Sequence, residues 1–177
     1  MIIIVEGLNG SGKTTLINKY IAESSGIWKR FKTWEIKPRF YYNNLCNKAF
    51  EDVVLSDFLY AVPISVNLFF DRSLVSGCVY KDIFHDITWN EQYLSYYFEK
   101  LQTGVNGPLK IIHLDTNYDL CCARTFEKKK EMIDVRRNYD LFYDRYNLLF
   151  ASLKIEKIVL NEQIQNVEMI RKFINKI

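Results

Sequence analysis

Cysteine is scarce in this sequence, and its spacing matches no redox motif. The four cysteines are Cys46, Cys78, Cys121 and Cys122, and no two of them form a C-x-x-C pair. The adjacent pair cannot easily bridge to itself, because a disulfide requires a particular separation of the two Cα atoms. We therefore expect no disulfide framework, and thiols that are reduced and mostly buried.

Long apolar runs, leader sequences and clustered histidines are also missing. No run approaches the ~18 apolar residues of a membrane span, and the chain opens on a strand-like run with no basic leader or cleavage site. We therefore expect a soluble, cytoplasmic protein with no membrane partner. His85 and His113 have no Cys or carboxylate partners at ligand spacing, so no metal other than magnesium is expected.

Neither sign of charge dominates the composition. The chain has 24 Lys and Arg against 21 Asp and Glu, a formal net charge of +3. A nucleic-acid binder usually concentrates its basic residues in a stripe, so we expect no nucleic-acid polymer as partner. With 49% hydrophobic and 25% charged residues, the composition is that of a globular protein, and residues 1–177 make one domain.

What the sequence does contain is a complete phosphate-binding loop. Gly7–Thr14 reads G-L-N-G-S-G-K-T, directly after the apolar run Ile2–Val5. In such a loop backbone N–H groups surround a phosphate, Lys13 reaches the β- and γ-phosphate oxygens, and Thr14 offers its hydroxyl to Mg²⁺. A helix that begins near Lys13 adds its positive end. We predict a nucleoside triphosphate, ATP, bound by Asn9, Gly10, Ser11, Gly12, Lys13, Thr14 and Thr15.

Apolar runs of strand length alternate with segments of helical period. The runs are Ile2–Val5, Thr33–Ile36, Asn67–Phe70, Leu109–Leu114 and Lys154–Leu160. Helices are expected at 15–23, 118–129, 135–153 and 165–177, and another after a capping box at Thr88 and Glu91, with Gly104 as its stop. This alternation is typical of parallel strands joined by crossover helices. The predicted fold is α/β, a doubly wound, five-stranded parallel sheet with helices on both faces.

The run that begins at Asn67 ends in Asp71 and Arg72. Ligands of doubly wound sheets bind beyond the carboxyl ends of the strands, so we expect both side chains at the same edge as the phosphate loop. Asp71 is a candidate for the magnesium shell or for steering an acceptor oxygen, and Arg72 for clamping a phosphate with its planar fork. The alternative is a surface ion pair between them.

These motifs together resemble the thymidylate kinase family, within the P-loop nucleotide and deoxynucleoside kinases. Val5–Thr15 is similar to that family's phosphate loop, and Asp71–Tyr80 resembles its Asp-Arg-Tyr-x-x-Ser segment. Softer likenesses follow in order at Pro108–Asp115, Phe142–Tyr146 and Ile158–Asn161. The resemblance covers nearly the whole chain. It implies the P-loop kinase fold with a short lid, ATP and Mg²⁺ as cofactors, and a homodimer.

The resemblance also implies roles for particular residues. Lys13 and Thr14 would serve ATP and the metal. Asp71 would support the metal or position the acceptor, while Arg72 would grip the acceptor's phosphate. Ser76 and Tyr80 would lie beside the acceptor nucleoside. The lid is expected at 124–138, and its candidate cations are Arg124, Lys128, Lys129, Lys130, Arg136 and Arg137, with Arg124 assigned to ATP and Arg136 and Arg137 to catalysis.

Three positions depart from the family pattern and bear on the acceptor. Asn9 stands where the family directs an acidic residue at the acceptor's 3′-hydroxyl, so hydrogen bonding is kept and charge is lost. Lys37 or Arg39 would replace the family arginine after the second strand. Tyr60 resembles the aromatic that stacks on the acceptor base, but Ile64 stands where an arginine is expected. The acceptor set is Asn9, Lys37, Arg39, Tyr60, Arg72, Ser76 and Tyr80.

The predicted function is transfer of the ATP γ-phosphoryl group to dTMP or a related deoxynucleoside monophosphate. A deoxynucleoside kinase is the nearest alternative, and it needs a general base, for which Glu35 is the candidate. Lys37 occupies the usual place of that base, and a cation there suits an acceptor that already carries a phosphate. The second alternative is a non-catalytic ATP-binding regulatory module, which has no use for Arg72 or a cationic lid.

Overall fold

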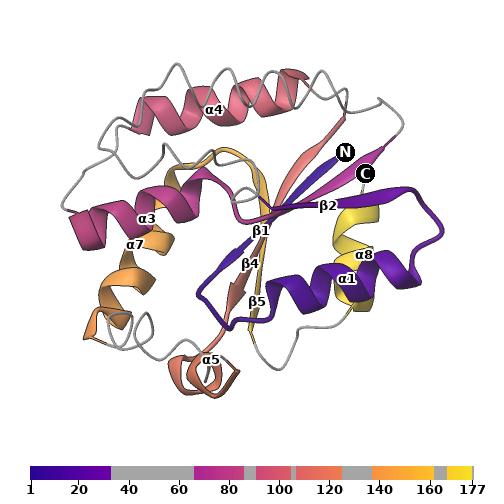
Figure 1. Ribbon diagram of the computed structural model, residues 1–177. Helices are drawn as coiled ribbons and strands as arrows, with labels where there is room; N and C mark the ends of the chain where they lie inside the picture. Colours follow the sequence, from indigo (N-terminus) through magenta and orange to yellow (C-terminus); the bar gives the residue numbers. More distant parts are fainter. Residues whose placement is uncertain (33–65, 86–90, 105–106, 125–136, 162–166, 177) are drawn as a thin grey trace.

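The computed structural model describes residues 1–32, 66–85, 91–104, 107–124, 137–161 and 167–176. Within these ranges five parallel strands form one sheet, in the order β2-β3-β1-β4-β5 (Figure 1). They are β1 (Ile2–Gly7), β2 (Trp28–Lys32), β3 (Asn67–Asp71), β4 (Leu109–Asp115) and β5 (Glu156–Asn161). The predicted five-stranded parallel sheet is confirmed, and its central strand is the one that leads into the phosphate loop.

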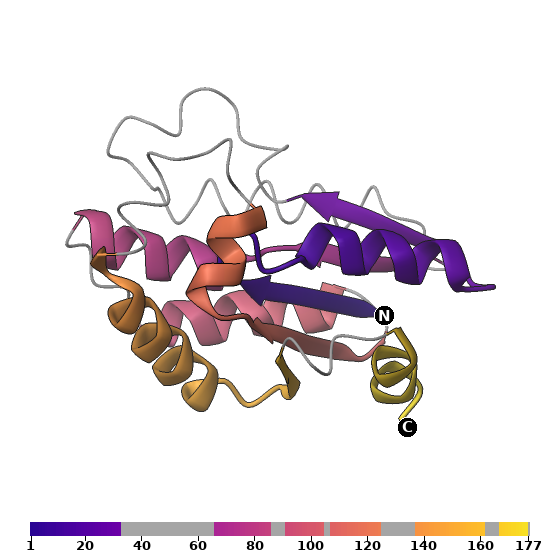
Figure 2. The ribbon, with the colours of Figure 1, turned by 90° about the horizontal axis from the view of Figure 1, so that it is seen from below.

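Helices cover both faces of the sheet (Figures 1 and 2). One face carries α1 (Lys13–Glu23) and α8 (Val167–Asn175), and the other carries α3 (Leu74–His85), α4 (Glu91–Gly104) and α7 (Tyr139–Ser152). The short α5 (Tyr118–Arg124) follows β4 at the carboxyl edge of the sheet. None of the helices in the described ranges is long and apolar enough to cross a membrane.

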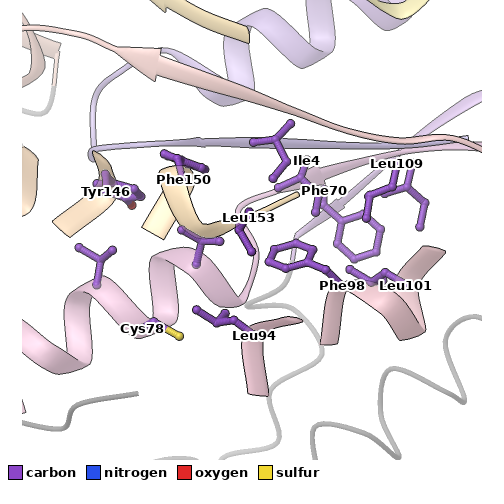
Figure 3. Close-up of a cluster of buried hydrophobic side chains, with 14 of the residues drawn as sticks. Ile4, Phe70, Cys78, Leu94, Phe98, Leu101, Leu109, Tyr146, Phe150 and Leu153 are labelled. Carbon is purple, nitrogen blue, oxygen red and sulfur yellow. The ribbon is translucent and has the colours of Figure 1, made fainter. Parts of the chain in front are cut away.

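Alternate residues of β1 supply two apolar cores, because successive side chains of a strand point to opposite faces. Ile2 and Ile4 belong to the core under α3, α4 and α7, whereas Ile3 and Val5 belong to the core under α1 and α8. Figure 3 shows the first core, in which strand and helix side chains meet: Ile4, Phe70, Cys78, Leu94, Phe98, Leu101, Leu109, Tyr146, Phe150 and Leu153.

The second strand of the described sheet lies just before the run predicted for it. The run Thr33–Ile36 falls outside the described residues, and β2 is formed by Trp28–Lys32 just before it. The Trp28 ring packs on Phe69 with a centroid distance of 4.7 Å, and Phe31 packs on Phe70 at 5.0 Å on the opposite face. Three of the five residues of this strand are cations, Lys29, Arg30 and Lys32, which hides it from a search for apolar runs.

Other element bounds shift by a few residues. β5 begins at Glu156 rather than at Lys154, and α7 begins at Tyr139 rather than at Val135. The α4 helix ends at Gly104 as predicted, while its proposed cap Thr88 lies outside the described residues. The α3 helix was not predicted. Tyr96 is exposed at the surface of α4.

A buried cation, Lys110 in β4, holds the end of α8. Its Nζ donates to the carbonyl oxygens of Phe173 and Lys176, each at 2.8 Å, and to that of Ile174 at 3.4 Å. It also lies 3.1 Å from a carboxylate oxygen of Glu156. The last carbonyls of a helix have no intrahelical donor, so a side chain that satisfies them stabilises the helix end.

We expect Lys110→Met to lower the free energy of unfolding by about 1–3 kcal/mol, because the substitution leaves buried carbonyls without a donor. Urea denaturation followed by circular dichroism measures the change. Lys154→Met, at an exposed position after α7, is the matched control and should stay within about 0.5 kcal/mol of the parent. A Lys110→Met protein as stable as the parent would contradict this role.

Candidate active site

The loop between β1 and α1 has the backbone of a phosphate cradle. Gly7, Gly10 and Gly12 all have positive φ, at 141°, 80° and 95°. A Cβ at Gly7 would lie 2.6 Å from the carbonyl oxygen of Leu114, so no side chain fits there. The backbone N–H of Ser11 turns back to the carbonyl oxygen of Leu8 at 3.2 Å. The loop is thus closed on itself at the start of α1, where N–H groups favour an anion.

Lys13 is turned into this loop. Its Nζ donates to the carbonyl oxygens of Gly7 at 2.9 Å and Leu8 at 2.5 Å, and to Oγ of Ser11 at 3.1 Å. Burial lowers the pKa of Lys13 well below its usual value, and the nearby charge of Arg72 lowers it further. A bound polyphosphate would favour the charged form, so the residues present fit an anionic ligand.

Thr14 and Asp71 meet across the gap between the loop and β3. The hydroxyl of Thr14 donates to Oδ2 of Asp71 at 2.5 Å. Arg30 of β2 approaches the same oxygen, with Nε at 3.8 Å, and donates from its fork to Oδ1 of Asn18 at 2.8 Å. The two predicted metal ligands are therefore brought together, and the structure adds a cation that the sequence analysis did not foresee.

Arg72 is the second buried cation of the site. Its guanidinium donates to Oγ of Ser76 at 3.0 Å and to Oδ1 of Asn9, and it lies 5.2 Å from the ring centroid of Tyr80. Its φ is 77°, a left-handed conformation that non-glycine residues rarely adopt and that costs on the order of 1–3 kcal/mol. Four of the predicted acceptor residues, Asn9, Arg72, Ser76 and Tyr80, are thus adjacent.

The first residue of the expected lid contacts the phosphate loop. Arg124, at the end of α5, donates to the carbonyl oxygen of Gly10 at 3.4 Å, which places it beside the loop. Arg137 is exposed just before α7, and no hydrogen bond or ion pair within the described residues joins it to the loop. Thr15 is exposed in the first turn of α1. Other predicted residues lie outside the described ranges: Glu35, Lys37, Arg39, Tyr60, Lys128, Lys129, Lys130 and Arg136.

Besides Arg30, two residues of the site were missed from the sequence. Glu6 is fully buried in β1 and accepts hydrogen bonds from Ser73 and Ser76. The hydroxyl of Tyr146, from α7, lies 2.9 Å from Oγ of Ser76. For Glu6 a signal was available, since a carboxylate follows directly on the apolar run that forms the central strand. No such signal was available for Tyr146, because its apolar helical neighbours predict only a core position.

His113 lies behind the loop as a buried neutral base. Its ring packs on Tyr146 and Phe150, with centroid distances of 5.3 and 4.6 Å, and within the described residues its Nδ1 has no hydrogen-bond partner. It lines a small cavity with Leu8, Asp115, Thr116, Tyr139 and Tyr143. Burial, and secondarily the charge of Lys13, lower the pKa of His113 to about 4.

We expect His113 to make the fold acid-sensitive. Between about pH 6.5 and about pH 4 the unfolded chain protonates this imidazole and the folded chain does not. The free energy of unfolding therefore decreases as the pH is lowered through this range, by up to about 3 kcal/mol. His113→Phe, which keeps the aromatic packing, should flatten this part of the profile and leave stability at pH 8 nearly unchanged. Urea midpoints from pH 8 to pH 4 measure it, and parallel profiles for the two proteins would contradict it.

No family model and no curated protein matches the sequence, but solved structures match in fold. YorR from Bacillus subtilis, solved with phosphorylated GDP, is 19% identical, with a TM-score of 0.67 over 98% of this chain and 93% of that chain. Deoxyadenosine kinase from M. mycoides is 18% identical, with a TM-score of 0.62 over 99% and 98%. Thymidylate kinase from Candida albicans is 17% identical, with a TM-score of 0.54 over 98% and 88%.

The sheet and the phosphate loop, together with these likenesses, define a protein with the P-loop kinase fold. This confirms the fold class predicted from the sequence. Identities below a fifth show the fold and no more, and thymidylate kinase is one of several kinases that share it.

Proposed function

We propose that this chain is a kinase that transfers the γ-phosphoryl group of ATP to a deoxynucleoside monophosphate, with dTMP as the first acceptor to test. The observation that carries the proposal is a pair of buried cations at adjoining strand ends. Lys13 lies in the phosphate loop, and Arg72 is joined to the same loop through Asn9. Phosphoryl transfer depends on positioning and on compensating negative charge, which two such cations supply on the donor and acceptor sides.

ATP and Mg²⁺ fit the residues of the loop. The cradle at Gly7 leaves no room for a side chain, and the Lys13 ammonium is turned toward its interior. The Thr14 hydroxyl and the Asp71 carboxylate are oxygen donors of the kind that Mg²⁺ prefers. When bound, the metal would neutralise charge on the phosphates. Arg30, 3.8 Å from Asp71, helps to hold that carboxylate at the loop.

A monophosphate acceptor is the best match for Arg72. A guanidinium binds a phosphate with two parallel N–H donors, and this one is fixed in place by Ser76 and Asn9. The aromatic ring of Tyr80 lies next to it. A lid that closes over the site would exclude water from the transfer, and Arg124 beside Gly10 is its candidate cation.

Deoxynucleoside kinase activity is the second candidate. It is supported by the likeness to the M. mycoides deoxyadenosine kinase, which spans nearly the whole of both chains and was solved with the products dCMP and dCDP. That reaction uses a neutral hydroxyl as acceptor, and Glu35 is the candidate base. The two activities differ in whether the acceptor brings a phosphate to Arg72.

ADP release with Mg-ATP against a panel of nucleosides and nucleoside monophosphates tests the proposal. Turnover with dTMP, abolished by EDTA and restored by excess Mg²⁺, is the expected result. Turnover with nucleosides alone would transfer the assignment to the second candidate and make Glu35 the residue to substitute. Binding of ATP with no turnover on any acceptor would favour a regulatory module. The resemblance to thymidylate kinases also implies a homodimer, and light scattering on the purified protein tests that expectation.

A further inference from the structure

Glu6 is a carboxylate in the central strand of the sheet with none of its surface exposed. Its Oε1 accepts from the backbone N–H of Ser73 at 2.7 Å and from the Ser73 hydroxyl at 2.6 Å. Its Oε2 accepts from the Ser76 hydroxyl. A buried carboxyl group is costly unless it is paired and hydrogen-bonded, so this cluster requires an explanation.

The donors around Glu6 are arranged for an ionised carboxylate. Three donors point at its two oxygens, and an ionised carboxylate can accept hydrogen bonds from all three of them. Burial raises the pKa of Glu6, while the two serines and the charges of Arg72 and Lys13 act in the opposite direction. In its ionised form Glu6 is the buried counter-charge of the two site cations.

Glu6 is connected to the Arg72 guanidinium through Ser76. The Ser76 hydroxyl has one hydrogen, which it gives to Glu6, so its oxygen accepts from Arg72 at 3.0 Å and from the Tyr146 hydroxyl at 2.9 Å. A carboxylate that takes the serine hydrogen therefore leaves the serine oxygen turned toward Arg72. A neutral side chain at position 6 would not hold the Ser76 hydroxyl in this one orientation.

Glu6 also supports the backbone that presents Arg72. The Arg72 N–H donates to the carbonyl oxygen of Val5 at 3.0 Å, and the next N–H along the chain, that of Ser73, donates to Glu6. These two bonds flank the left-handed φ of Arg72. Strain of this kind persists only where the surroundings fix it.

We propose that Glu6 is a positioning residue for Arg72. The carboxylate fixes the turn after β3 and the Ser76 oxygen together, and so aims the guanidinium at the acceptor side of the phosphate loop. This inference deepens the proposed function and rests on it for its catalytic consequence. Its structural content, the fixed orientation of Arg72, is measurable without any turnover.

Side-chain NMR of Arg72 tests the structural content. In the parent protein the pinned guanidinium should give separate ¹⁵Nη signals, assigned by their loss in Arg72→Lys. In Glu6→Gln these signals should merge, because rotation of the group is no longer restrained. Lys110→Met, which removes a buried cation far from the loop, should leave them separate. Separate signals in Glu6→Gln would overturn the proposal.

Kinetics test the catalytic consequence. We expect Glu6→Gln to lower kcat/KM for the acceptor by about 10- to 100-fold, and Glu6→Gln combined with Arg72→Ala to be no worse than Arg72→Ala alone. Independent, multiplying losses would overturn the proposal. Ser73→Ala, which removes one donor and keeps the N–H, should give a smaller loss with the same dependence on Arg72 and serves if Glu6→Gln does not fold. Turnover absent from the parent would refute the proposed function, while the NMR result would still decide the role of Glu6.

Discussion

Lys13→Met should lower kcat by on the order of 10³-fold, a loss expected when a principal charge-stabilising group is removed from a water-excluded site. The ammonium of Lys13 is turned into the loop by Gly7, Leu8 and Ser11 and is 6% exposed. Methionine keeps the apolar stem and removes the charge. Steady-state ADP release with saturating Mg-ATP and acceptor measures the loss.

Lys19→Met is the matched control for this prediction. Lys19 lies on the same helix, α1, at an exposed position. The same substitution there should leave kcat within about twofold, as surface changes away from a site do. Thermal melts of both variants separate loss of charge from loss of fold. A Lys13→Met enzyme that keeps a tenth or more of the parent kcat would contradict the assigned role of this ammonium.

The sheet and the donor side of the site were accessible from the sequence because their signals are local. Ile2–Val5 reads as a buried strand, and the glycines and Lys13 that follow have a fixed spacing. Asp71 and Arg72 followed from the rule that parallel strands end at one edge. In the structure this rule brings Thr14 and Asp71 into hydrogen-bond contact across 57 positions of sequence.

What could not be predicted depends on long-range contacts between polar groups. The partners of Glu6 are Ser73, 67 residues away and just before α3, and Ser76, 70 residues away in α3. Nothing in the local sequence indicates that these serines face a carboxylate. Arg30 was missed for a similar reason, since a cation in a segment with as many cations as Trp28–Lys32 predicts a solvated side chain. Asn9 was expected at the acceptor sugar, and its contact with Arg72, another residue of the expected acceptor set, could not be predicted from the sequence.

Arg72→Lys should lower kcat/KM for a monophosphate acceptor by on the order of 10²-fold while the affinity for ATP stays within about twofold. Lysine keeps the charge but replaces the planar fork, which donates to Ser76 and Asn9, by a single ammonium. It therefore cannot present two parallel N–H donors to a phosphate. Acceptor-saturation kinetics measure the first quantity, and calorimetry with ATP measures the second. The loss should be smaller for a nucleoside acceptor, which has no phosphate for the fork.

Arg145→Lys provides the control for this substitution. Arg145 of α7 is ion-paired with Asp82 of α3 at 2.6 Å, and its side chain is 41% exposed. Exposed ion pairs contribute about 0.2–1 kcal/mol, so the same exchange of fork for ammonium should cost little there and leave the kinetics unchanged. If Arg72→Lys keeps the parent kcat/KM, the fork is not used on the acceptor. If ATP affinity falls in parallel, Arg72 acts on the donor side. Either result would contradict the role in acceptor recognition that we assign to Arg72.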